Sequence, residues 1–158
     1  MKRIVLILVM FAVSAVVPAQ AGDGDAILGV WATDAEGDGG QAHVEIFADG
    51  DRYSGKIVWL EKPLYTAEDE DDEEGEPKVD KNNPDKALQS RPIMGLLLME
   101  GFRFDGKGTW HKGTIYDPDN GKTYKCKVRF GDDGVLKVRG YIGFSMMGRT
   151  SEWTRFED

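Results

Sequence analysis

The feature that most constrains the fold is a regular series of short β-type runs separated by turn clusters. From Leu28 onward, stretches rich in Val, Ile, Thr, Tyr, Phe and Trp alternate with clusters of Gly, Asp and Asn, which is typical of an all-β domain. The pattern predicts eight strands, near residues 28–33, 42–48, 53–61, 95–104, 109–116, 122–130, 135–142 and 148–156. Because closure removes unpaired sheet edges, we expect an eight-stranded antiparallel up-and-down barrel, with a β-sandwich as the alternative.

The predicted strands at 122–130 and 135–142 have the clearest alternation of apolar and polar residues, and this alternation predicts how the two strands pair. Pairing Val128 with Val138 places the apolar residues of both strands on one face. The opposite face then carries a cationic ribbon, in which Lys127 lies opposite Arg139 and Arg129 lies opposite Lys137. Opposed like charges destabilise a sheet, so we expect this ribbon to attract an anion: the acidic segment described below, a phosphate-bearing lipid or another anionic component of the envelope. A solvated face of splayed side chains is the alternative.

Residues 1–21 have the form of a cleavable signal peptide. A basic pair is followed by an aliphatic run at 4–17 and by the small-x-small sequence Ala19-Gln20-Ala21. The run is shorter than the roughly 20 apolar residues of a membrane helix. We therefore expect cleavage after Ala21 and a single β-barrel domain at 22–158, with no transmembrane segment, in the periplasm or outside the cell.

The charge of the chain is strongly acidic. It has 28 acidic and 20 basic residues, and two of the basic residues precede residue 22, so the mature chain has a net charge of −10. This balance argues against nucleic acid as a partner. A segment without strand-like alternation, near 62–91, contains eight acidic residues between 68 and 76. Such a density of like charge predicts a solvated insertion. If Glu70 is taken as position one of an EF-hand loop, position twelve is Lys81. This position needs a bidentate glutamate, so the lysine excludes that calcium motif.

Residues suited to catalysis or metal binding are sparse in the sequence. Cys126 is the only cysteine, and its alternation with apolar neighbours predicts a buried free thiol. His43 and His111 lack the spacing of zinc ligands and are expected at the surface. The sequence contains no nucleophile elbow, P-loop or dinucleotide fingerprint. We therefore expect no catalysis, no resident metal and no cofactor.

Several motifs along the chain occur together in a known family. They are Asp80-x-x-Asn83-Pro84, Arg91-Pro92-Ile93-Met94-Gly95-Leu96, Gly113-x-Ile115-Tyr116-Asp117-Pro118, Gly121-Lys122-x-Tyr124 and Val138-Arg139-Gly140-Tyr141. With these motifs, the chain resembles the DUF2147 family of exported bacterial proteins over nearly all of its mature length. The resemblance implies a lipocalin-like β-barrel. It implies no activity, because none is assigned to the family.

The first and last predicted strands carry a further resemblance. Gly29-x-Trp31 is similar to the lipocalin signature, in which a first-strand tryptophan closes one end of the barrel beneath an arginine of the last strand. Arg155 is the matching arginine. A guanidinium over an indole face contributes about 0.5–2 kcal/mol, so we expect these residues to close the barrel.

These observations favour an exported, lipocalin-like protein that binds a small apolar or amphipathic ligand without catalysis. An eight-stranded barrel is either filled by side chains or holds one small ligand, and the sequence leaves both open. The expected interior residues are Trp59, Leu98, Phe102, Tyr124, Val128 and Val138. The alternative is a cell-envelope interaction module that acts through its charged outer surfaces, and an enzyme is a third hypothesis.

Overall fold

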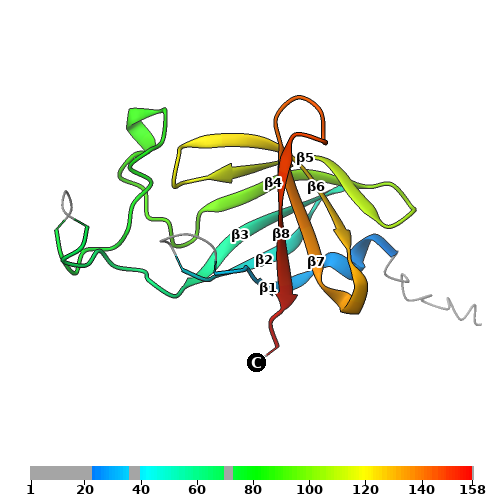
Figure 1. Cartoon of the computed structure of the whole chain (residues 1–158), viewed down its shortest axis with the longest axis horizontal. Helices are drawn as coiled ribbons and strands as arrows, with labels where there is room; N and C mark the ends of the chain where they lie inside the picture. Colours follow the sequence, from blue (N-terminus) through cyan, green and yellow to red (C-terminus); the bar gives the residue numbers. More distant parts are fainter. Residues whose placement is uncertain (1–22, 36–39, 70–72, 158) are drawn as a thin grey trace, which may run out of the picture.

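The protein is an antiparallel β-barrel whose eight strands pair in chain order and close between the first and the last (Figure 1). The structure, a computed structural model, describes residues 23–35, 40–69 and 73–157, so the expected signal peptide lies outside the described residues. The strands are β1 (Gly29–Ala32), β2 (Ala42–Asp49), β3 (Arg52–Leu60), β4 (Leu97–Phe104), β5 (Thr109–Asp117), β6 (Lys122–Phe130), β7 (Leu136–Tyr141) and β8 (Gly148–Arg155).

The predicted strands and the predicted register are both confirmed. Each strand begins and ends within two residues of its expected bounds. Between β6 and β7, Val128 pairs with Val138 and Lys127 with Arg139, as the alternation of apolar residues required. The alternation of apolar and polar residues was therefore enough to predict the register of the β6–β7 hairpin. A shift of one residue would have exchanged its buried and solvent-facing sides.

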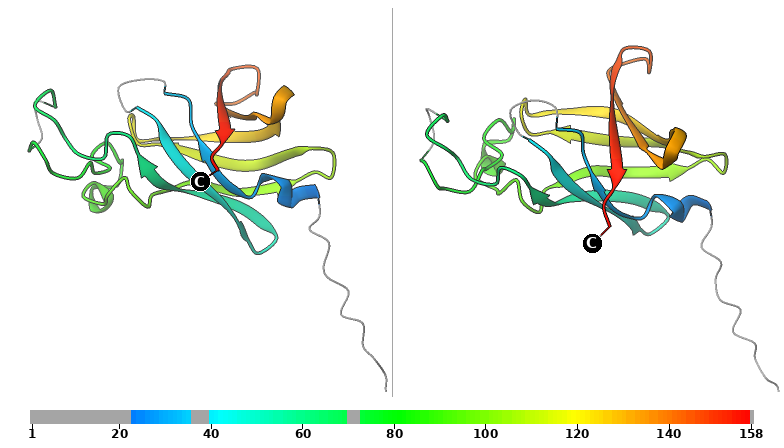
Figure 2. Two further views of the ribbon diagram at one scale, coloured as in Figure 1. Left: turned by 90° about the horizontal axis from the view of Figure 1, so that it is seen from below. Right: turned by 60° about the horizontal axis from the view of Figure 1, so that its bottom comes forward.

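One end of the barrel is closed by the segment that precedes β1. The short 3-10 helix η1 (Asp23–Ile27) lies across this end, opposite the end that carries the long β3–β4 connection (Figure 2). Two buried indoles bind its backbone: Trp31 Nε1 donates to the Ile27 carbonyl at 2.9 Å, and Trp110 Nε1 donates to the Gly24 carbonyl at 3.0 Å. Each indole thus has an apolar environment for its ring and an acceptor for its N–H group.

Arg155 completes the closure of this end. Its guanidinium lies 4.3 Å from the ring centroid of Trp31 and donates to the carbonyls of Ala26 and Leu28, both at 2.8 Å. Gly29 makes this approach possible, because its φ is +119° and a Cβ there would lie 2.7 Å from Arg155 Nη1. The contact expected from the Gly29-x-Trp31 sequence is therefore present.

The half of the barrel next to the closed end is filled by side chains. The fully buried residues there include Trp31, Trp110, Phe102, Val128 and Leu136. They belong to one contiguous apolar cluster that also contains Cys126, whose thiol is buried as expected. Phe130 packs between the two indoles, with its ring centroid 5.9 Å from Trp31 and 5.6 Å from Trp110.

Trp59 does not face the interior, and the sequence prediction was wrong at this position. A β-bulge shifts the β2–β3 register, so that His43 pairs with Trp59 while Val44 pairs with Ile57. The extra residue, Val58, reverses the alternation, and Trp59 is 41% exposed on the outside of the barrel.

The expectation of a surface His43 was also wrong. Its imidazole is 9% exposed because it lies between the rings of Trp59 and Phe156, with centroids 4.4 and 4.1 Å away.

The connection between β3 and β4 is more ordered than its charge suggested. Two isolated β-bridges, Leu64 to Pro77 and Val79 to Pro92, bring its halves together, and the short 3-10 helix η2 (Lys86–Leu88) lies near its far end. The acidic residues described at the tip, such as Glu73 and Glu74, are exposed as predicted. Within the described parts of the chain, no helix has the length and apolar character needed to cross a membrane.

Candidate functional site

The open end of the barrel holds a cavity of about 500 Å³. It lies opposite η1, among the ends of β1, β4, β5, β6, β7 and β8. Its apolar wall comes from Leu98, Ile115, Val138 and Trp153, which the strand alternation directs inward. The barrel is therefore filled by side chains in its closed half and has a cavity at its open end.

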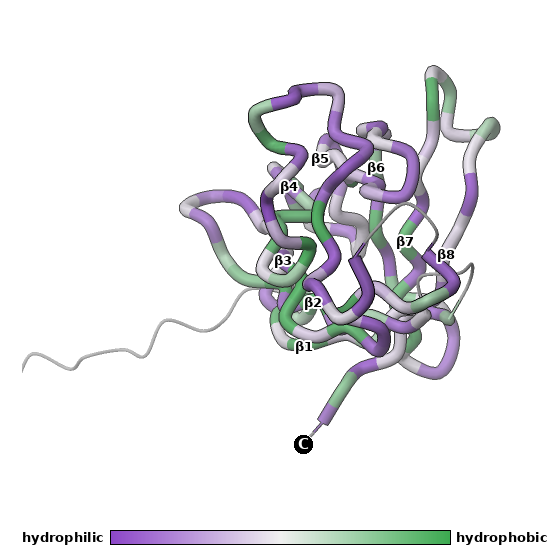
Figure 3. Tube along the Cα trace, turned by 90° about the vertical axis from the view of Figure 1, so that its left-hand side faces the viewer, coloured by the Kyte–Doolittle hydropathy of each residue, from purple (hydrophilic) through white to green (hydrophobic). Residues whose placement is uncertain are grey.

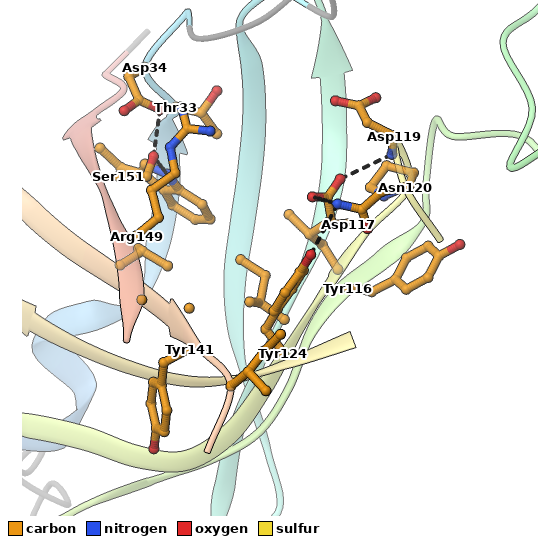
Figure 4. A pocket seen from close by; sticks show the side chains of 18 of the residues that line it. Thr33, Asp34, Tyr116, Asp117, Asp119, Asn120, Tyr124, Tyr141, Arg149 and Ser151 are labelled. Atoms are coloured by element: carbon orange, nitrogen blue, oxygen red, sulfur yellow. Dashed lines mark hydrogen bonds between the residues drawn. The ribbon is translucent and has the colours of Figure 1, made fainter. Parts of the chain in front are cut away.

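One side of the cavity mouth is built where β1 and β8 meet. The Ser151 hydroxyl donates to one carboxylate oxygen of Asp34, and it accepts a hydrogen bond of 2.8 Å from Trp153 Nε1. The backbone N–H of Glu152 donates to the other Asp34 oxygen at 3.4 Å. These bonds hold the Asp34 carboxylate at the rim, where Figure 4 also shows Thr33 and Arg149.

The opposite side of the mouth is the turn between β5 and β6. The Asp117 carboxylate accepts hydrogen bonds from the Asp119 backbone at 3.0 Å and from Asn120 Nδ2 at 2.7 Å. The same Asn120 nitrogen donates to the Tyr124 hydroxyl at 3.1 Å, which positions this phenol beside the cavity (Figure 4). Because these contacts are local to the turn, they fix a polar rim without help from a ligand.

A buried carboxylate outside the cavity anchors the β3–β4 connection to the barrel. Asp80 is fully buried. Its Oδ2 accepts hydrogen bonds from Arg91 Nε at 2.9 Å and from Asn83 Nδ2 at 2.8 Å, and Arg91 Nη2 lies 2.8 Å from the same oxygen. Its Oδ1 accepts from the Tyr116 hydroxyl at 2.6 Å. Burial of Tyr116, and then its hydrogen bond to Asp80, raise the pKa of this phenol above its ordinary value.

The anchored connection also supports the cavity rim. Asn82 Nδ2 donates to the carbonyls of Pro118 and Asp119 at 3.2 and 3.0 Å, so it holds the β5–β6 turn from outside. Gly121 is needed for this approach, because its φ is +69° and a Cβ there would overlap the Asn82 carbonyl. Tyr116 belongs to both structures, since it lines the cavity and binds Asp80.

Sequence reasoning treated this connection as an insertion and missed its anchor. The network joins residues of three family motifs, two of them close in sequence (Asp80 with Asn83, and Arg91) and the third distant (Tyr116). The sequence signal for this anchor was that several motifs without catalytic residues occur in one chain. The residues of these motifs contact one another, and no local sequence pattern shows those contacts.

The expected interior residues occupy three different environments. Leu98, Tyr124 and Val138 line the cavity. Phe102 and Val128 belong to the filled half of the barrel, at 1% and 0% exposure, and Trp59 lies outside it.

The cationic ribbon has the predicted pairing, but two of its members have partners on or beside β8. Lys137 Nζ lies 3.0 Å from Glu152 Oε1. Arg139 donates to the Thr150 hydroxyl at 2.8 Å and to the carbonyls of Ser145 and Met146 at 2.8 and 3.2 Å. Lys127 and Arg129 complete the ribbon on β6.

The parts of the chain that the structure describes contain no group of three or more His, Cys, Asp or Glu side chains arranged to hold a metal ion. The burial of Cys126 raises the pKa of its thiol to about 12, so this thiol is protonated at neutral pH.

A closed eight-stranded barrel with an arginine–tryptophan contact at one end and a cavity at the other defines a lipocalin-like protein. The chain belongs to the family described as "Uncharacterized protein conserved in bacteria (DUF2147)", whose model matches residues 29–155. The family resemblance and the fold expected from the sequence are thus confirmed.

The barrel is also similar to a solved structure described as "Protein HP1028 from the human pathogen Helicobacter pylori belongs to the lipocalin family". The TM-score is 0.69 at 23% sequence identity, and the alignment covers 83% of each chain. Among curated proteins, none matches the sequence.

Proposed function

We propose that the protein binds a small amphipathic molecule in the open end of its barrel and carries out no chemistry on it. The observation that carries this proposal is the cavity of about 500 Å³, with an apolar wall and a polar rim. Sites for small molecules commonly have volumes of about 300–1,000 Å³ and combine an apolar lining with a few fixed polar groups. The lipocalin-like fold is compatible with the same function, because an eight-stranded barrel whose interior is not filled by side chains can hold one small ligand.

The arrangement of the lining suggests how such a ligand would be oriented. Its apolar part would contact Leu98, Ile115 and Val138, and its polar part would lie at the mouth near Asn120 and Arg149. Removing apolar surface from water supplies the affinity, whereas the rim supplies orientation.

Two carboxylates of the rim, those of Asp34 and Asp117, have a structural role. Asp34 accepts hydrogen bonds from Ser151 and the Glu152 backbone, and Asp117 accepts hydrogen bonds from its own turn. Both carboxylates are thus used to hold the mouth in shape.

The test begins with native mass spectrometry of protein purified from its own host, in which we expect a retained small molecule. The variant Leu98→Trp places an indole in the cavity, and we expect it to lose the adduct. Leu97→Trp is the matched control, because Leu97 precedes Leu98 on β4, is 40% exposed and does not line the cavity. Equal retention by both variants, or wild-type protein that neither retains an adduct nor binds an amphipathic dye, would reject the proposal.

We also propose that the protein works outside the cytoplasm, in the periplasm or beyond it, after cleavage behind Ala21. The basic pair, the aliphatic run and the Ala19-Gln20-Ala21 site support this proposal. The first residue of the protein recovered from the cell envelope should be Gly22. A mature chain that still begins at Met1 would contradict it.

A further inference from the structure

The hairpin between β7 and β8 exposes an unusual amount of apolar surface. Four large side chains within residues 142–147 are 66–90% exposed, and they are Ile142, Phe144, Met146 and Met147. The other exposed large hydrophobic side chains of the described residues are only 38–45% exposed. Figure 3 shows the hairpin projecting from the barrel with hydrophobic stretches near its tip. Contiguous exposed apolar surface of this kind marks an interaction site.

The hairpin is held in a defined shape. Arg139 reaches across it and donates to the carbonyls of Ser145 and Met146. Within the hairpin, the Met147 N–H donates to the Phe144 carbonyl at 3.0 Å. These bonds satisfy the carbonyls of Phe144, Ser145 and Met146 within the hairpin, which lowers the cost of moving this segment out of water.

The segment from β6 to β8, which includes the hairpin, has a net positive charge, although the whole protein is acidic. Residues 122–155 contain eight basic and three acidic residues, a net charge of +5, whereas the rest of the mature chain has a net charge of −15. On β6, Lys125 pairs with Tyr141 at the base of the hairpin, and Lys127 pairs with Arg139. Two of the three acidic residues, Asp132 and Asp133, lie in the β6–β7 turn at the other end of these strands.

We propose that the β7–β8 hairpin docks the protein onto an anionic lipid bilayer. The side chains of Ile142, Phe144, Met146 and Met147 enter the interfacial region, while Lys125 and Lys127 lie against the phosphate-bearing headgroups. An apolar projection flanked by cations is the combination that interfacial membrane-binding elements use. The acidic β3–β4 connection lies elsewhere on the barrel (left in Figure 1) than the hairpin (top in Figure 1), so it is not forced against the bilayer.

A protein partner fits the same surface less well. A stable protein interface buries about 800 Å² on each side, whereas the apolar surface here is confined to one narrow projecting hairpin. A second copy of the chain is the remaining occupant, and the experiment below separates it from a bilayer.

The position of the hairpin links docking to the cavity, a consequence that rests on the proposed function. Ile142 and Met147 line the cavity as well as forming part of the hairpin. Docking therefore places the side of the mouth that Ile142 and Met147 line beside the membrane surface, where an amphipathic ligand can be exchanged with the bilayer. Phe144 and Met146 are not part of the lining.

The experiment measures co-sedimentation of the mature chain with phosphatidylcholine vesicles that contain or lack phosphatidylglycerol. We expect binding to the anionic vesicles and much weaker binding to the neutral ones. The double variant Phe144→Ser/Met146→Ser should reduce anionic binding at least about tenfold, since it removes the most exposed apolar groups. The matched control, Leu88→Ser/Met94→Ser, changes two exposed apolar residues of the β3–β4 connection and should bind like the wild type.

The charge contribution is tested by Lys125→Glu/Lys127→Glu, for which we expect about a tenfold loss of binding to anionic vesicles. Lys86→Glu/Lys107→Glu makes the same change of net charge in η2 and in the β4–β5 turn, outside β6 to β8, and should have a smaller effect. Vesicle binding that the hairpin variant leaves unchanged, or no binding to anionic vesicles, would overturn the proposal. A dimer in sedimentation velocity that the hairpin variant dissolves, without vesicle binding, would assign the surface to a second copy. Cavity ligand retained by Phe144→Ser/Met146→Ser would show that a docking defect is separate from ligand binding.

Discussion

At the scale of single residues, Gly29 and Arg155 form the contact that ties the first strand to the last. β1 and β8 share only two paired positions, Trp31 with Arg155 and Ala32 with Thr154, which is the shortest pairing in the barrel. The guanidinium strengthens this seam by joining the Trp31 ring to the carbonyls before β1. A side chain at residue 29 would displace it.

We therefore predict that Gly29→Ala lowers the free energy of unfolding by about 2 kcal/mol or more, because it adds both a clash and a strained φ. Gly50→Ala is the matched control. Its φ is +63°, but a Cβ there has no neighbour within 4 Å, so we expect a loss of only about 1 kcal/mol. Urea unfolding of the two variants compares them directly. Equal losses would mean that the Arg155 contact adds nothing to the seam.

The buried thiol of Cys126 gives a second prediction, on alkaline stability. The unfolded thiol loses its proton near pH 9 and the folded one near pH 12, so the folded state holds one more proton within this interval. Stability must then fall as the pH rises above 9, by up to about 1.4 kcal/mol for each pH unit. Tyr53, whose pKa burial and a hydrogen bond to Asp25 raise to about 12, acts in the same direction at higher pH.

Replacing this thiol by Cys126→Ala should make the dependence on pH shallower. The variant loses some packing at every pH, but that loss is a constant offset, whereas the titration changes the slope. Urea unfolding at intervals between about pH 8 and pH 10 separates the two effects. Parallel stability curves for wild type and variant would show that the thiol does not titrate differently on folding.

At the scale of elements, the β3–β4 connection has a solvated tip and an anchored far end. We predict that Asp80→Asn lowers stability by about 2 kcal/mol, because it removes the charge that Arg91 and Tyr116 both bind. Asp132→Asn, in an exposed turn without a side-chain cap, is the control. Replacing residues 68–74 by a Gly-Ser linker of equal length should change stability by about 1 kcal/mol or less. If the linker lowered stability more than Asp80→Asn does, the tip rather than the Asp80 anchor would hold the connection in place.

The elements that the sequence predicted well are those with a local cause. Alternation and turn residues are properties of neighbouring positions, so the strands and the β6–β7 register were predictable. Trp59 was placed on the wrong face because a bulge adds one residue to β3 without any local mark. Asp80 was missed for a different reason: its partner Tyr116 is 36 residues away. The cavity was only partly predictable, because strand alternation identifies inward residues but not whether their neighbours fill the space.

At the scale of the whole molecule, charge and apolar exposure are distributed unevenly. Residues 122–155 have a net charge of +5 and include the apolar hairpin, while eight of the 28 acidic residues lie within nine positions of the β3–β4 connection. The ribbon cations Lys137 and Arg139 are already engaged by Glu152 and by the hairpin carbonyls. If the hairpin docks on a membrane as proposed, we expect the acidic tip to act on that association through its long-range field.

This field leads to the last prediction. Eight of the 28 acidic residues lie between residues 68 and 76, so converting them all to their amides reduces the net charge of the mature chain from −10 to −2. The chain length and the hairpin are unchanged. We expect this variant to bind anionic vesicles more tightly than the wild type at low salt, because less repulsion opposes the attraction of Lys125 and Lys127. The gain should shrink at physiological ionic strength, where exposed charges are screened over about 8 Å.

Adding Lys125→Glu/Lys127→Glu to the amide variant should abolish the gain, whereas adding Lys86→Glu/Lys107→Glu should leave most of it. Equal vesicle binding by the amide variant and the wild type across a salt series would show that the acidic tip does not act on membrane association.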